Sequence, residues 1–402
     1  MTVEPKVSSC RQCPIHTLAT YLEQLLQPLF ENFSQSTTFL TGHDFIQKLQ
    51  YYCVQQDSLL PITNFVTFKI HNLHTEASHD DILTALNRFL DKEFVTGRHH
   101  RLTIDAIEAL AAIVLRNNVF SYNGKIYRHI KGSPLNLPLT RLLFNIYLHN
   151  WQIPLVRQIR LADEFYGRYH NMGLLTWYGP TDKLQICFNE LNKEYPDIQI
   201  TTSVGIQVDF LNAYIENRKG NLYTRVHHNP LLQPFLLPYV TGHPRLIHRQ
   251  WLRFILIRAG QYCSSWEDFN EERLYIELTF LANGYSLDFV EYHLQQFFTR
   301  FNPVELKITL SRWTYPSFRT RLSRYLNQQK QGLEQVKTLE NKNPEIIQLF
   351  YLFDWGSRYG FNQKFYELWS TILNADPVFR KFGLQIKLNS KHCYSSNTLC
   401  VQ

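Results

Sequence analysis

The stretch "RYHNMGLLTW", residues 168–177, is a β-prone run that is interrupted near its centre by Asn171 and Met172. Its aromatic and β-branched residues favour extended backbone, so strands are expected within residues 166–178. Apolar residues at three- and four-residue steps predict a helix before the run, at 139–152, and another after it, at 181–193. This part of the chain is therefore expected to mix strands with helices.

The remainder of the first half shows the same mixture. Pro28 is expected to end or kink the first helix, and Asn123-Gly124 between two β-prone runs predicts a hairpin. From about residue 243 onward the spacing is almost wholly helical, with a polar linker or exposed helix at 328–343. Further helices are expected at 17–30, 80–90 and 102–118, and further strands at 65–73, 198–203, 206–215 and 221–227.

The composition excludes several classes of protein. Hydrophobic residues make up 44% of the 402 residues and aromatic residues 14%, which is typical of a globular chain and not of a disordered one. The net charge of +7 permits a polyanionic partner without requiring one. Neither a signal peptide nor a membrane span is indicated. The seven scattered cysteines are typical of reduced thiols, so an intracellular location is expected, nuclear or cytoplasmic.

Several motifs occur in an order that resembles the reverse transcriptases of Penelope-like retroelements, from about residue 5 to residue 398. The segment "FKIHNLHTEASHDDIL" is similar to the first catalytic block of that family, and it keeps Phe68 and Thr75. "GSPLNLPLTRLLFNIYL" is similar to the second block and keeps Gly132 and Pro138, although Leu135, Asn136, Leu137 and Arg141 depart from the pattern. "RYHNMGLLTW" resembles Arg-Tyr-x-Asp-Asp-Ile-x-x-x-Trp and keeps Arg168, Tyr169 and Trp177.

This resemblance implies an α+β fold built as a right-hand polymerase palm with shortened fingers. By this resemblance, residues 1–60 are residual fingers and leader helices, and residues 61–230 are a reverse-transcriptase-like palm. Residues 231–327 are a helical thumb of helix-turn-helix type, and residues 344–402 are a C-terminal helical segment. No GIY-YIG endonuclease is expected after them.

The resemblance also shows what this chain has replaced. Lys69 stands where the family has its first catalytic aspartate, and Asn171 and Met172 stand where it has two adjacent aspartates. Nucleotidyl transfer by this fold uses two Mg²⁺ ions, which require clustered anionic oxygen ligands. An ammonium group ~4 Å from a divalent cation repels it by several kcal/mol at an effective dielectric near 20. No catalytic residue and no cofactor are therefore expected.

Other carboxylates offer an alternative set of metal ligands. Asp163 and Glu164 precede the run at 168–177, Asp80 and Asp81 begin a helix, and Asp209 lies near the later hairpin. None falls at the strand tip or turn where a two-metal site is built. Mg²⁺ would be bound only if the chain were a polymerase with unusual ligands. "CRQCPIH" offers Cys10, Cys13 and His16 but no nearby fourth ligand, so no zinc site is expected.

Two basic stretches without acids point to a nucleic-acid partner. The first, "HPRLIHRQWLRFILIRAGQ", places its first three arginines four residues apart, on one helical face. The second, "RWTYPSFRTRLSRYLNQQK", interleaves arginines with Trp313, Tyr315 and Phe318. Arginines can contact phosphates while aromatic rings stack on bases. An ordinary solvated face with core aromatics is the alternative. The candidate nucleic-acid-binding residues are Arg245, Arg249, Arg253, Arg258, Arg319 and Arg324.

The sequence leaves three functions open. The first is a reverse-transcriptase-like protein that no longer polymerises but binds RNA or an RNA/DNA hybrid. The second is a scaffold that keeps the fold for contacts with unknown protein partners. The third is an RNA-directed DNA polymerase with unusual active-site ligands.

Overall fold

The computed structural model describes residues 14–55, 58–93, 98–99, 102–122, 125–134, 136–195, 198–229, 245–301, 311–340, 346–352, 361–369, 371 and 385–391. The chain divides into two compact units, Met1–Tyr223 and Thr224–Gln402. Each unit is described by itself below.

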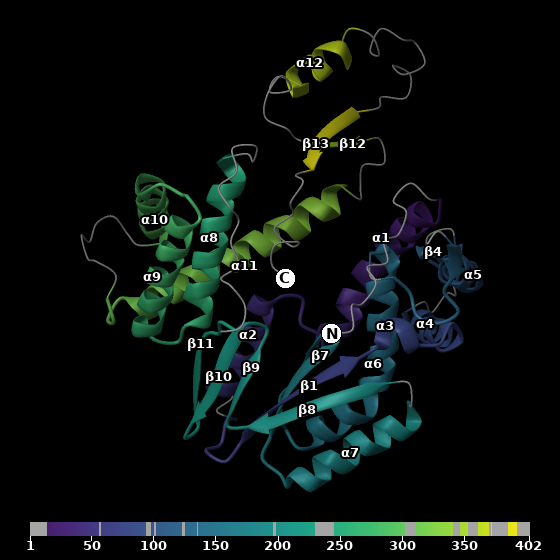
Figure 1. The fold of residues 1–402 in the computed structure, drawn as a ribbon, viewed down its shortest axis with the longest axis horizontal. Helices are drawn as coiled ribbons and strands as arrows, with labels where there is room; N and C mark the ends of the chain where they lie inside the picture. The colour runs from purple at the N-terminus through teal and green to yellow at the C-terminus, as the bar shows by residue number, and fades with distance from the viewer. Residues whose placement is uncertain are drawn as a thin grey trace. The chain divides into compact units, whose positions relative to one another are not determined.

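A four-stranded antiparallel sheet organises the first unit (Figure 1), with the strand order β6-β7-β1-β8. Its strands are β1 (Asn64–His71), β6 (Tyr166–Tyr169), β7 (Met172–Trp177) and β8 (Gln199–Gly205). Strand β1 lies in the middle and pairs with β7 on one side and with β8 on the other. The stretch at 168–177 is therefore a hairpin beside the central strand.

Helices cover one face of this sheet because its buried side chains alternate along β1. Phe68 and Ile70 are buried, whereas Lys69 between them is exposed on the opposite face. The ring of Phe68 lies 5.8 Å from Trp151 of α6 (Pro138–Leu161) and 5.8 Å from Phe188 of α7 (Thr181–Glu194).

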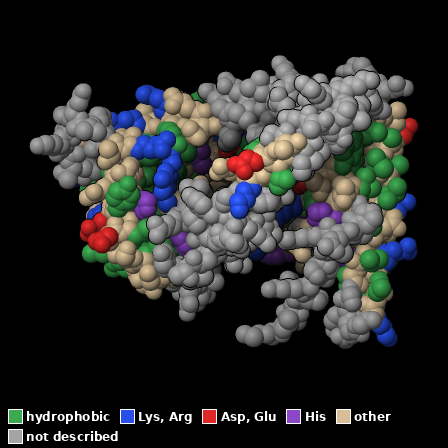
Figure 2. All heavy atoms as spheres, turned by 90° about the horizontal axis from the view of Figure 1, so that it is seen from above, with side chains coloured by type: hydrophobic (Ala, Val, Ile, Leu, Met, Phe, Trp, Pro, Cys, Tyr) green, Lys and Arg blue, Asp and Glu red, His purple; other side chains and the backbone are tan. Residues whose placement is uncertain are grey.

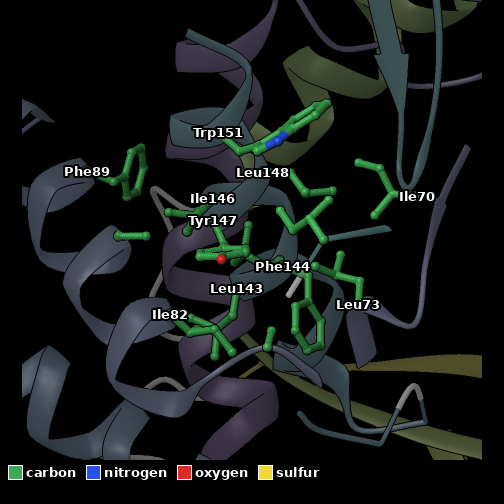
Figure 3. Packing of buried hydrophobic residues seen from close by; sticks show 14 of the residues in the cluster. Ile70, Leu73, Ile82, Phe89, Leu143, Phe144, Ile146, Tyr147, Leu148 and Trp151 are labelled. Carbon is green, nitrogen blue, oxygen red and sulfur yellow. The ribbon is translucent and has the colours of Figure 1, made fainter. Parts of the chain in front are cut away.

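The core of the first unit is centred on α6, as Figure 3 shows. Ile146 and Tyr147 of α6 lie on the side of Phe89, which belongs to α4 (His79–Glu93). Ile70 and Leu73 lie on the other side of the helix. Helix α1 (Pro14–Ser34) also packs against α6, and α5 (Ile104–Arg116) packs against α4. One continuous apolar cluster therefore joins the sheet to its helices.

Shorter elements complete the first unit. The hairpin β4–β5 pairs Tyr122 with Lys125, as the Asn123-Gly124 dipeptide predicts, and a three-stranded sheet has the order β11-β10-β9. The elements are α2 (Gly42–Gln50), the π-helix η1 (Tyr51–Gln55), α3 (Leu73–Glu76), β2 (Arg98–His99), β3 (Leu102–Thr103), β4 (Val119–Tyr122), β5 (Lys125–Arg128), β9 (Gln207–Phe210), β10 (Ala213–Arg218) and β11 (Asn221–Val226).

Four helices form the main body of the second unit: α8 (Arg245–Tyr262), α9 (Trp266–Ala282), α10 (Leu287–Phe301) and α11 (Tyr315–Glu340). Aromatic rings fill the space between them. Phe269, Phe297 and Phe301 surround Phe318, with ring centroids 5.6–6.2 Å from it. Beyond these helices lie α12 (Phe361–Leu368) and a parallel pair of strands, β12 (Ile346–Leu352) and β13 (Gln385–Lys391).

The first helix does not end at Pro28, since α1 contains this residue and continues to Ser34. Two expectations were wrong. The stretch 206–215 forms two strands, because Leu211 and Asn212 adopt positive φ between them. The segment 344–402 is not wholly helical, since it contains β12 and β13. The sequence of β12, "IIQLFYL", is a short apolar run, and periodicity cannot tell such a strand from a buried helix.

Gly132 shows why one motif position requires glycine. Its φ is +64°, and a Cβ atom there would lie 1.8 Å from the carbonyl oxygen of His74. The Gly132 N–H donates to Ala77 at 2.8 Å, and its carbonyl oxygen lies 2.8 Å from Nε2 of His79. These contacts hold the loop before α6 against the start of α4.

We expect Gly132→Ala to lower the free energy of unfolding by about 2–4 kcal/mol, because the left-handed backbone and the overlap with His74 both oppose a side chain. Urea denaturation measures this loss. Gly205→Ala is the matched control, since Gly205 lies outside the left-handed region and its nearest atom would be 3.1 Å away. Equal losses for the two variants would contradict the explanation.

Candidate functional site

The three positions where the resemblance expects acids lie together at the end of one ladder. Lys69 of β1 is directly opposite Met172 of β7, and Asn171 is in the turn that joins β6 to β7. His170, beside it in this turn, has a φ of +50°. The side-chain amide of Asn171 donates to the carbonyl oxygen of Ile70 at 2.9 Å, so the turn is fastened to the central strand.

This group of side chains does not fit a magnesium site. Lys69 contributes an ammonium group on the open face of the sheet, and Met172 contributes a thioether. Asn171 uses its amide N–H within the sheet. Mg²⁺ prefers carboxylate and other hard oxygen ligands in octahedral geometry. Among the residues that the structure describes, no group of three or more His, Cys, Asp or Glu side chains could hold a metal ion. Cys10 and Cys13 lie outside those residues.

The nearest alternative carboxylate has a structural role elsewhere. Glu164 is buried, and it accepts hydrogen bonds from the Tyr178 N–H at 2.7 Å, from the Tyr52 hydroxyl at 3.3 Å and from Thr176. Burial raises the pKa of Glu164 above its ordinary value. Thr176 pairs with Phe65, at the opposite end of the β1–β7 ladder from the Met172 pair. Glu164 therefore secures the far end of the hairpin.

The other acids considered from the sequence are also away from the turn. Asp80 at the start of α4 forms an exposed ion pair with Arg116 at 2.8 Å. Asp81 is exposed on the same helix, and Asp209 lies on β9, outside the four-stranded sheet. Asp163 follows α6 with a φ of +56° and precedes β6. None of these residues belongs to the turn at 170–171.

A fully buried arginine holds the hairpin in place. The Nε of Arg168 donates to Oε1 of Gln152 at 3.0 Å, and Nη1 donates to Oδ1 of Asn145 at 2.9 Å and to the His170 carbonyl. Both amide side chains belong to α6. Burial lowers the pKa of Arg168 to about 10, so its guanidinium is still charged at neutral pH. The guanidinium of Arg168 thus attaches the hairpin to α6, and the acceptors of these hydrogen bonds are all uncharged oxygens.

The surroundings of the turn lower the pKa of neighbouring histidines. Burial, and then the charge of Arg141, lower the pKa of His74 and of His170 to about 4. Burial, and then the charge of Arg168, lower the pKa of His149 to about 4. These three rings are therefore neutral at pH 7, mainly because they are buried, and the charges of Arg141 and Arg168 act in the same direction.

The other positions that match the motifs have local structural roles. Thr75 donates from its hydroxyl to Asn72 O at 3.0 Å, and Pro138 begins α6, where a missing N–H costs nothing. The ring of Tyr169 packs on His170 at 4.3 Å. Trp177 donates its indole N–H to a backbone carbonyl three residues later, at 3.1 Å.

In the second unit, arginines from two helices line one pocket. Arg249 and Arg253 of α8 meet Arg300 of α10 around a volume of about 310 Å³. Figure 2 shows, at its left, Lys and Arg side chains gathered beside His side chains on the helices of this unit. The described residues that line the pocket include no acid; the others are Tyr292, His293, Gln296, Phe297 and Thr299.

The remaining candidate arginines do not join this pocket. Arg319 donates to the carbonyl oxygens of Gly260 and Gln261 at 3.3 and 3.0 Å, so it caps the C-terminal end of α8. Arg258 is half-buried on α8, and Arg324 is exposed on α11. The side chain of Arg245 lies outside the described part of the structure.

Two of the three interleaved aromatic residues belong to the core. Tyr315 and Phe318 are buried, whereas Trp313 is 89% exposed.

Arg300 and Tyr292 line the pocket but were not predicted from the sequence, because the α10 stretch contains Asp288 and Glu291 and so is not a basic stretch without acids. A usable signal exists, since Tyr292, Gln296 and Arg300 follow one another at four-residue steps on one helical face.

Comparisons with known proteins support the fold. A family model described as an animal helix-turn-helix domain matches residues 235–295, which include α8 and α9. No curated protein sequence matches the chain. The structure of telomerase from Candida albicans, in complex with a fragment of telomeric RNA, is similar with a TM-score of 0.52 and 10% identity, over 78% of this chain and 56% of that chain.

Two further solved structures are similar at lower scores. Telomerase from Candida tropicalis matches with a TM-score of 0.44 and 13% identity, over 69% of this chain and 47% of that one. The RNA-dependent RNA polymerase of a human picobirnavirus matches with a TM-score of 0.47 and 12% identity, over 70% of this chain and 54% of that one. The chain spans about half the length of the Candida albicans telomerase chain, and its fold is polymerase-like. No helix among the described residues is long and apolar enough to cross a membrane.

We expect the stability of the chain to fall as the pH is lowered from about 6.5 to about 4. In this window the unfolded state binds more protons, because the pKa values of His74, His149 and His170 are lowered from 6.5 to about 4 in the folded state. Urea denaturation midpoints at several pH values measure the slope.

His74→Phe should flatten this pH dependence, because the ring already packs edge-on against Phe144 at 4.9 Å and the variant cannot be protonated. The control is His71→Gln on β1. The partly exposed side chain of His71 forms a hydrogen bond between its Nε2 and the hydroxyl oxygen of Thr201, at 2.8 Å. An unchanged slope in His74→Phe would refute the assignment.

Proposed function

We propose that this chain is a reverse-transcriptase-like protein of retroelement origin that does not polymerise and that binds RNA or an RNA/DNA hybrid. In this proposal the four-stranded sheet corresponds to a palm and helices α8–α11 to a thumb. The observation that carries the proposal is the placement of Lys69, Asn171 and Met172 together at the end of one ladder in a polymerase-like fold.

The loss of polymerisation follows from the ligands available at this turn. Two-metal catalysis needs carboxylates that bridge both ions. Here the turn offers the neutral amide of Asn171 and the thioether of Met172, and the residue opposite Met172 is an exposed lysine. Glu164, the buried acid of the same hairpin, is at the other end of the ladder with its oxygens occupied. At this turn Mg²⁺ would therefore lie near the ammonium group of Lys69 and would find no carboxylate ligand.

The proposed binding of nucleic acid is supported by the charge of the second unit. Arg249, Arg253 and Arg300 lie around one pocket, and no described acid lines it. Arginine is suited to phosphate because its guanidinium donates several hydrogen bonds in a fixed plane. The telomerase with a similar fold was solved with telomeric RNA. RNA, alone or paired with DNA, is therefore the partner we propose.

Primer extension on an RNA template tests the loss of activity. With Mg²⁺ or Mn²⁺ we expect no template-dependent product from the wild-type chain, because its turn lacks anionic ligands. Template-dependent product that disappears in Asn171→Ala or Asp163→Asn would instead establish a polymerase with unusual ligands.

Metal binding at the same turn provides the matched comparison. We expect the triple variant Lys69→Asp, Asn171→Asp, Met172→Asp to bind Mn²⁺, as detected by electron paramagnetic resonance, while the wild type binds none there. The paired register of residues 69 and 172 places the new carboxylates side by side. Mn²⁺ bound equally by both proteins would oppose the proposal.

Binding of RNA should weaken steeply with salt, because phosphate contacts release counterions. We expect filter-binding titrations to give a negative slope of log affinity against log salt, and Arg249→Ala and Arg253→Ala to reduce this slope by about 0.7 to 1 unit each, with the lower value for a single strand. Absent or salt-independent binding would favour the alternative, a scaffold for protein partners.

A further inference from the structure

The pocket between α8 and α10 has features that select one form of nucleic acid. We propose that it binds a single nucleotide unit of a single-stranded nucleic acid, with the phosphate on Arg249, Arg253 and Arg300 and the base stacked on Tyr292. This inference rests on the proposed function, because it assumes that the chain binds nucleic acid. To the proposed function it adds the place of binding, the preference for a single strand and the residue on which a base stacks.

Two arginines of the pocket, Arg253 and Arg300, are held close together by the hydroxyl group of Tyr325. Nη2 of Arg253 and Nη2 of Arg300 both donate to the hydroxyl oxygen of Tyr325 on α11, the latter at 3.2 Å. Both guanidinium groups also lie over the Tyr325 ring, 5.3 and 4.6 Å from its centroid. The ring partly offsets their mutual repulsion. Two positive charges are thus positioned before any ligand arrives.

An anion would complete this arrangement. No ion pair found among the described residues involves Arg249, Arg253 or Arg300. Burial, and then the charge of Arg249, lower the pKa of His293 in the same pocket. The described lining of the pocket therefore carries positive charge and no acid. A phosphate group accepts several hydrogen bonds from guanidinium groups and would supply the missing charge.

The size of the pocket argues against a duplex. Its volume of about 310 Å³ is at the small end of the range for sites that enclose a ligand. A duplex keeps its bases paired inside a wide cylinder, so it could reach only the rim of such a pocket with its backbone. A single strand can turn one nucleotide out and into it.

Tyr292 offers the surface on which a base can stack. It lines the pocket, and its side chain is 58% exposed. Single-stranded nucleic acids commonly combine phosphate contacts with stacking on aromatic rings. Gln296, one turn further along α10, brings an amide to the same wall, where a base or sugar can form hydrogen bonds. An acidic peptide would use the arginines but has no base to stack.

Fluorescence anisotropy with the full chain tests the inference, using a labelled RNA 12-mer without secondary structure and a duplex of the same sequence as competitor. We expect Tyr292→Ala to weaken binding of the single strand by about 5- to 100-fold and Tyr292→Phe to preserve it within about twofold, because the ring and not the hydroxyl carries the stacking. The duplex should compete at least about tenfold more weakly.

Arg253→Ala and Arg300→Ala should each reduce the salt slope by about 0.7, the value for one phosphate contact in a single strand. The matched control is Arg312→Ala, which removes the same charge from an exposed arginine paired with Glu267 at 3.2 Å. Tyr325→Phe keeps the ring but removes the shared acceptor, and it should weaken binding without altering the stacking contribution of Tyr292.

Three results would overturn the inference. The first is equal loss in Arg312→Ala and Arg253→Ala, which means that only net charge matters. The second is equal competition by the duplex. The third is competition by polyglutamate that depends on Tyr292 and Arg253 in the same way, which would assign the pocket to acidic polypeptides. RNA binding that persists in all pocket variants refutes the inference alone, whereas absence of any RNA binding refutes the proposed function as well.

Discussion

The position of the β6–β7 hairpin depends on the buried guanidinium of Arg168. An isolated charge in a protein interior is costly, and it is tolerated only when hydrogen bonds replace its lost water. Arg168 is fully buried and donates to Gln152, Asn145 and the carbonyl of His170. Because two of these acceptors belong to α6, the sheet and its central helix are fixed to each other by one side chain. The turn at 170–171 therefore has a defined place, whatever its chemistry.

The groups around the turn differ from those of a magnesium site. The partners of Arg168 are amide and carbonyl oxygens, which carry no charge. Burial, and then the charge of Arg141, lower the pKa of His74 and of His170, so both rings are neutral at pH 7. The exposed Lys69 places a cation at the end of the ladder. Among the described residues, the turn and the residue opposite it therefore offer no carboxylate to a divalent cation.

Much of this arrangement could be predicted from sequence. The alternation in β1 and the helical spacing of α4, α5, α6 and α7 are strong local signals, because each element buries one face against the same core. The motif resemblance placed Lys69 and the Asn171-Met172 turn in one palm, whereas the register that pairs Lys69 with Met172 could not be predicted, because no local pattern specifies which strands become neighbours. The strand β12 was missed because a short apolar run carries no decisive period. Arg319 was predicted to bind nucleic acid, but its value as a cap for α8 depends on tertiary packing.

The arginines of the two units differ in their hydrogen-bond partners. This difference distinguishes an arginine that stabilises the fold from arginines that can bind a ligand. In the first unit, Arg168 has no exposed surface, and amide and carbonyl oxygens occupy its Nε and both Nη groups. In the second, Arg253 and Arg300 donate to one shared phenol oxygen, and both side chains line the pocket. A buried cation whose donors are all used inside the fold is not available to a ligand, whereas cations that line a pocket can exchange their water for an anion. For this reason the arginines of the second unit, and not the buried one at the turn, mark the surface where a phosphate is expected.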